Sequence, residues 1–91
     1  MFAPVFMNGE GRRILRLDYS GLSPEQLEGA MKIAMRVIAS EPPGSVRLLT
    51  IANAQLDAHS AESIKLYAAH NKPYIRASAL VGANAFQKIL A

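Results

Sequence analysis

The residues whose types could support chemistry gather around the first of two histidines. Asp57, His59 and Ser60 supply the carboxylate, imidazole and hydroxyl of a hydrolytic triad. One local run does not bring a nucleophile, a base and an orienting group together without special geometry. His70 lies eleven positions after His59, about three helical turns, which is too far for the two rings to share a metal ion. We therefore expect no catalytic, metal-binding or cofactor-binding residues, and no enzyme.

A weaker expectation is a binding site at two turns that follow predicted parallel strands. Ligands of open α/β sheets bind outside the carboxyl ends of the strands. Helix N-termini at that edge offer free N–H groups and a partial positive charge to an anion. The alternative is that these residues only cap helices and complete turns. The candidates are Asn53, Gln55, Asp57, His59, Ser60, Gly82 and Asn84.

The first element that must support such turns is a hairpin. Two apolar runs, residues 2–7 and 13–19, flank a segment that begins with the Asn8-Gly9 pair. Asn-Gly between such runs predicts a hairpin turn, because both residues tolerate positive φ. Pro4 removes a hydrogen-bond donor from the first run, so we expect that strand at a sheet edge.

A helix and a strand are predicted next. Ser23 is placed to cap the helix, Pro24 suits the first helical position, and Gln26 completes a capping box. Apolar residues then recur at helical spacing until residues 41–44, which end the helix. Residues 46–51 form a nearly continuous β-forming run. Such runs are typical of a strand that is covered on both faces.

The remainder predicts a second helix, a last strand and a terminal helix. Asp57 or Ser60 is placed to cap the second helix, which ends near residues 70–73. Side chains of residues 74–81 alternate between the two faces of the predicted strand and form one stripe on each face. A turn at residues 82–84 leads into the last helix. One stripe holds Ile75, Ala77, Ala79 and Val81, and the other holds Tyr74, Arg76, Ser78 and Leu80.

The predicted order is β-β-α-β-α-β-α, which places the chain in the α/β class. We expect one domain over residues 1–91, with helices packed on a mostly parallel four-stranded sheet. The N-terminal strand is the antiparallel edge. A chain of 91 residues with 51% hydrophobic and 19% charged residues excludes a disordered tail.

Composition also limits the partners. No apolar stretch is long enough to span a membrane. The net charge of +3 and the 7% aromatic content predict no binding to nucleic acid, since no base-stacking motif accompanies the arginines. With no cysteine and no recognisable export signal, we expect a cytoplasmic protein.

Three segments resemble small bacterial STAS-like proteins, relatives of the anti-sigma-factor antagonists that share a superfamily fold with lipid-transfer domains. They are residues 12–22 (RRILRLDYSGL), 39–46 (ASEPPGSV) and 70–82 (HNKPYIRASALVG). The resemblance covers nearly the whole chain and implies a STAS-like domain. Its implied function is a non-enzymatic regulatory module that binds other proteins. The alternative is a small-molecule or lipid sensor, with an apolar cavity under the first helix.

The resemblance also identifies a departure from the family pattern. STAS antagonists carry an Asp-Ser-Ser-Gly motif whose second serine is the phosphorylation switch. Asp57 matches the acidic position, but Ala58 and His59 occupy the serine positions, and Ser60 comes one residue late. We therefore expect that this chain lacks the serine switch.

Family members usually continue with another strand and a final helix, so we expect a shortened domain. The last strand would then have an open edge that invites pairing. The terminal helix would also expose apolar side chains, and pairing with a second copy, by default with twofold symmetry, would cover them. The self-association candidates are Phe86, Ile89 and Leu90. The expected partners are thus a second copy or another protein, or a small apolar or anionic ligand.

Overall fold

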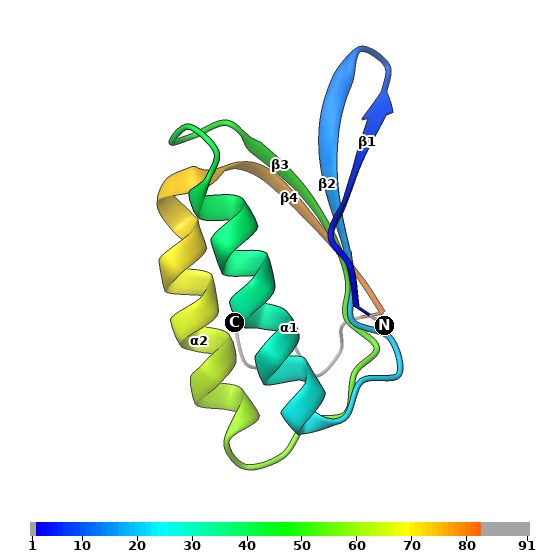
Figure 1. Ribbon diagram of the computed structural model, residues 1–91, viewed down its shortest axis with the longest axis vertical. Helices are drawn as coiled ribbons and strands as arrows, with labels where there is room; N and C mark the ends of the chain where they lie inside the picture. Colours follow the sequence, from blue (N-terminus) through cyan, green and yellow to red (C-terminus); the bar gives the residue numbers. More distant parts are fainter. Residues whose placement is uncertain (1, 83–91) are drawn as a thin grey trace.

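The computed structural model describes residues 2–82, which form a single mixed sheet with two helices packed against it (Figure 1). The predicted fold class and element order are confirmed as far as the last strand. The predicted terminal helix lies outside the described residues, together with Asn84, Phe86, Ile89 and Leu90. The elements are β1 (Val5–Gly9), β2 (Arg12–Asp18), α1 (Pro24–Ala39), β3 (Val46–Ile51), α2 (Ser60–Asn71), a 3-10 turn η1 (Lys72–Tyr74) and β4 (Ile75–Val81).

The N-terminal hairpin forms as predicted, but its turn lies two residues later than the Asn-Gly pair. Gly9 pairs with Arg12, so Glu10 and Gly11 make the two-residue turn, with φ of 52° and 75°. Positive φ at both central residues matches the right-handed twist of the strands. Asn8 and Gly9 therefore belong to β1, which is the antiparallel edge strand of the sheet.

The strand order is β1-β2-β3-β4, with parallel pairing from β2 to β4. Both crossover helices lie on one face of this sheet, and no described element covers the other face (Figure 1). Within residues 2–82, the expectation that β3 is covered on both faces is therefore not met. Val46, Leu48 and Thr50 are buried toward the helices, whereas alternate residues of β3 are only partly buried.

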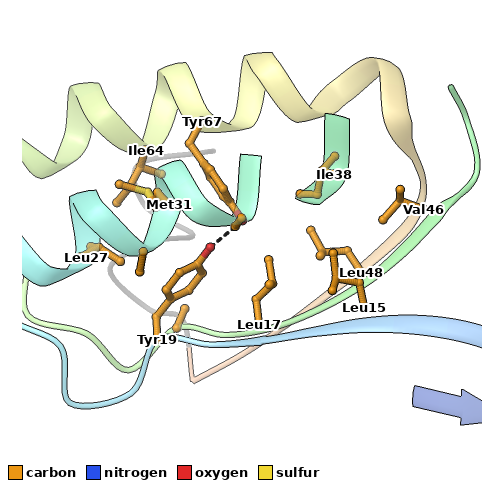
Figure 2. Close-up of a cluster of buried hydrophobic side chains, with 13 residues drawn as sticks. Leu15, Leu17, Tyr19, Leu27, Met31, Ile38, Val46, Leu48, Ile64 and Tyr67 are labelled. Carbon is orange, nitrogen blue, oxygen red and sulfur yellow. Dashed lines mark hydrogen bonds between the residues drawn. The ribbon is translucent and has the colours of Figure 1, made fainter. Parts of the chain in front are cut away.

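The core lies between the helix pair and the covered face of the sheet (Figure 2). The capping box at Ser23 and Gln26 starts α1 as predicted, with Pro24 at its first turn. The buried side chains of α1 recur at helical spacing and meet those of β2 and β3. They are Leu27, Ala30, Met31, Ala34 and Ile38.

No helix among residues 2–82 is long and apolar enough to cross a membrane.

The last strand, β4, starts with a bulge that changes its predicted stripes. Val46 pairs with Ile75, but the next residue, Arg47, pairs with Ala77, so Arg76 is the extra residue. The bulge places Ile75 beside Ser78 and Leu80 on the helix-facing side, where all three line one cavity. The predicted stripe that joins Ile75 to Ala77 is therefore wrong at its first position.

Candidate functional site

The polar turn after β3 meets the end of β4 at one point. The backbone N–H of Gly21 donates to the Asn53 carbonyl at 3.1 Å, and that of Gln55 donates to the Leu22 carbonyl at 3.0 Å. A Cβ atom at Gly82 would meet the Asn53 carboxamide, so these two residues lie against each other. The side chains of Asn53 and Gln55 remain exposed. The structure thus brings Asn53 and Gly82 together at the carboxyl edge of the sheet.

Asp57 and Ser60 form a reciprocal cap at the start of α2. The Asp57 carboxylate accepts from the backbone N–H groups of His59 at 2.9 Å and of Ser60 at 3.1 Å. The Ser60 hydroxyl donates to the same carboxylate oxygen at 3.1 Å and accepts from the Asp57 backbone N–H at 2.9 Å. The carboxylate thus accepts from the N–H of the N-cap residue His59, and it shares the Ser60 N–H with the Asp57 backbone carbonyl, which lies 3.2 Å away. These contacts are those of a helix cap.

The hydrogen bond from the His59 backbone, followed by those from Ser60, holds the pKa of Asp57 below its usual range. Because the folded-state pKa is the lower one, the ionised carboxylate adds stability at neutral pH. That contribution is lost as the pH falls below about 4 and through the folded-state pKa.

We expect Asp57→Ala to lower the urea midpoint at pH 7, because the start of α2 loses its cap. The difference between Asp57→Ala and the unchanged protein should shrink at pH 3, because the stabilisation by the carboxylate decreases once the pH falls below its unfolded-state pKa of about 4. Urea unfolding at both pH values measures this. Glu62→Ala is the matched control, since it also removes a carboxylate from the first turn of α2. An equal loss at both pH values would contradict the assignment of the carboxylate as the cap.

The starts of α1 and α2 together line an acidic groove. Its carboxylates come from Glu25, Glu28, Asp57 and Glu62, and His59 lies among them. Negative side chains at these helix starts oppose an anionic ligand there. Within residues 2–82, no group of three or more His, Asp or Glu side chains is placed to hold a metal ion.

His70 lies at the other end of α2. Its Nδ1 lies 2.9 Å from the Asn71 side-chain oxygen, and its ring stacks on Tyr74 with centroids 6.0 Å apart. The rings of His59 and His70 therefore belong to opposite ends of one helix. The residue types of a triad are present in the chain, but the structure assigns them to caps and turns.

The arginines of the strands divide between the two faces of the sheet. Arg13 lies on the helix side, where it pairs with Glu41 and stacks over the Phe6 ring. Arg16 pairs with Asp18 at 3.3 Å, and Arg12 and Arg47 line a shallow depression on the opposite face. Arg12, Arg16 and Arg47 thus share the face opposite the helices, and Arg13 alone of these four lies on the helix side.

A feature that the sequence reasoning missed is the bare face of the sheet. We call it the outer face and define it by the outward side chains of β2, β3 and β4. Its depression of about 570 Å³ has an apolar floor with arginines and a glutamate at its margin. The sequence did contain a signal for this face, because side chains alternate along a strand and every second residue of β3 and β4 must point away from the helices. With the matching residues of β2, the outward side chains are Arg12, Ile14, Arg16, Asp18, Arg47, Leu49, Ile51, Ala77, Ala79 and Val81.

An apolar cavity of about 460 Å³ lies on the helix side, between α2 and the last two strands. Ile64 and Tyr67 of α2 form one wall, and Leu48, Ile75 and Leu80 form the floor. The predicted cavity lay under the first helix, whereas this one lies beside the second. Its floor includes β4, because neither described helix covers that strand completely.

A comparison with known proteins finds no matching family model, and no similar chain among the curated proteins or the solved structures.

Proposed function

We propose that this chain is a non-enzymatic regulatory module of STAS type, which binds another protein in the cytoplasm of a bacterium. The observation that carries the proposal is the bare outer face, which continues to the free edge of β4. Both helices lie on the opposite side, so no described element shields this surface (Figure 1).

The outer face has the composition of a docking surface. Leu49 and Ile51 of β3 are partly buried in the chain alone, and Val81 of β4 is 51% exposed. Contiguous apolar surface of this kind, bordered by charges, is typical of protein interaction sites. A partner bound there would bury apolar surface at the centre of the outer face. It would form ion pairs with Arg12 or Arg47 at the margin of that face.

The proposed regulation works without the serine switch of the family. Ser60 is the serine nearest to the switch position, and it is only 3% exposed. Its hydroxyl is held by Asp57 both as donor and as acceptor. A kinase would have to break this cap to reach the hydroxyl, so partner binding rather than phosphorylation at Ser60 is the proposed signal.

Capture of partners from an extract of the native host, with two matched variants, tests the proposal. Leu49→Lys places a charge at the centre of the outer face, whereas Ile33→Lys places one on an exposed position of α1. A specific partner should be retained by Ile33→Lys and reduced at least about tenfold by Leu49→Lys, the ratio that 1.4 kcal/mol represents. Equal retention by both variants would show that the outer face is not the docking surface.

The apolar cavity supports a second candidate function, the binding of a small apolar molecule. Its lining is mostly aliphatic, and its volume is within the range of ligand pockets. Native mass spectrometry of gently purified protein should then show an added mass that is lost in Ala68→Phe, a variant that fills the cavity. Spectra with no added mass would remove this candidate.

A further inference from the structure

At the free edge of β4, the backbone N–H and C=O groups of every second residue are available for hydrogen bonds with another strand. The Ala52 backbone N–H donates to the Val81 carbonyl at 2.9 Å, so the polar groups of Val81 point toward β3. Backbone direction alternates along a strand, and Ala77 and Ala79 must therefore also point toward β3. The N–H and C=O groups of Ser78 and Leu80 point the other way, to an edge that no described strand occupies.

The opposite edge of the sheet is less suited to pairing. Pro4 immediately precedes β1 and lacks a backbone donor, and β1 leaves the plane of the sheet with the protruding hairpin (Figure 1). β4 has no proline, and its residues from Ala77 to Val81 carry no charge. Small side chains at Ala77, Ser78 and Ala79 allow another strand to approach closely. The two edges therefore differ, and within residues 2–82 it is β4 whose edge carries none of these protective features.

We infer that the partner of this edge is a second copy of the chain, paired antiparallel through β4 about a twofold axis at Ala79. The inference rests on the proposed interaction function and adds a second copy of the chain at the free edge. In this register Ser78 of each copy lies opposite Leu80 of the other, and these residues exchange backbone hydrogen bonds. Ala79 lies opposite itself as a non-hydrogen-bonded pair, where side chains come closest.

The ends of β4 select this register. A twofold axis at Ser78 would bring the bulged residue Arg76 into the ladder opposite Leu80. An axis at Leu80 would need Gly82, whose φ of 66° ends the strand. The axis at Ala79 keeps both irregular residues outside the paired segment. It also continues the outer face into the second copy and sets the two apolar cavities on the same side of the joined sheet.

A single-cysteine test follows directly, because the chain has no cysteine of its own. Ala79→Cys should form a disulfide-linked dimer under mild oxidation, since the two side chains lie opposite each other across the axis. Ala77→Cys is the matched control: it lies on the same face of the same strand but opposite Val81, so it should crosslink at least about tenfold more slowly, a ratio that 1.4 kcal/mol represents. Equal crosslinking at both positions, or none at Ala79, would overturn the register.

Charge substitution gives an independent readout of the same axis. Ala79→Glu and Ala79→Lys should each be monomeric in sedimentation equilibrium, because each places like charges together, and their mixture should form a heterodimer. Ile33→Glu and Ile33→Lys should leave the dimer unchanged. A wild-type chain that stays monomeric, or a mixture no tighter than its components, would overturn the inference. The wild-type chain could be monomeric while Leu49→Lys still loses the captured partner. That combination would reject self-pairing but support the proposed function.

Discussion

Replacing Leu17 with alanine is expected to lower the free energy of unfolding by about 2–5 kcal/mol, the range for truncating a fully buried leucine. Leu17 is 0% exposed and lies in β2 within the core between sheet and helices (Figure 2). The truncated side chain leaves a cavity there, because neighbouring side chains relax only partly. Chemical denaturation followed by circular dichroism measures the loss.

Leu49→Ala is the matched control for this prediction. The same side chain is shortened on the neighbouring strand, but it points to the outer face and is only partly buried. Its loss should be clearly smaller than that of Leu17→Ala, because fewer protein atoms surround it. Equal losses would mean that the outer face is covered in solution, which would contradict the basis of the proposed docking surface.

The second large effect is expected at the buried tyrosine pair. The Tyr19 hydroxyl donates to the Tyr67 hydroxyl at 2.9 Å, with the two rings edge to face (Figure 2). Tyr19→Phe leaves the Tyr67 hydroxyl without this donor and should cost about 1–3 kcal/mol. The double replacement with phenylalanine should cost less than the sum of the two single ones, because it removes both polar groups. A strictly additive result would show that the pair makes no coupled hydrogen bond.

Alkaline pH offers a second measurement on this pair. Burial raises the pKa of Tyr19 and of Tyr67 above the ordinary value. Because the folded-state pKa is the higher one, the contribution to stability is complete below about pH 10 and is lost as the pH rises further. The double phenylalanine variant should therefore lose less stability than the unchanged protein between pH 8 and pH 11.

Local signals were sufficient to predict the element order as far as β4. Ser23, Pro24 and Gln26 identify the start of α1 because their cap involves only neighbouring residues. The hairpin was predictable, but not its turn, because Gly9 and Gly11 both tolerate positive φ and the strand register decides between them. The bulge at Arg76 depends on how β4 meets β3, and no local pattern in β4 contains that information.

The layers were harder to predict than the elements. A strand rich in β-formers indicates burial, but the sequence of β3 does not state on which side each helix passes. The outer face exists because both crossover helices pack on the same side of the sheet, and this arrangement is visible only in the structure. For the polar turns, the sequence predicted that Asp57 or Ser60 caps α2. In the structure the N-cap position is His59, and the Asp57 carboxylate accepts from the backbone N–H groups of His59 and Ser60.

Residue-resolved amide exchange measures whether β4 presents a free edge for docking. In dilute protein, the Ser78 and Leu80 amides should exchange rapidly, whereas those of Ala77 and Ala79 should be protected by β3. Raising the protein concentration should protect Ser78 and Leu80 and leave the other two unchanged. Equal protection of all four amides in dilute monomer would contradict the account, because the edge would then already be covered.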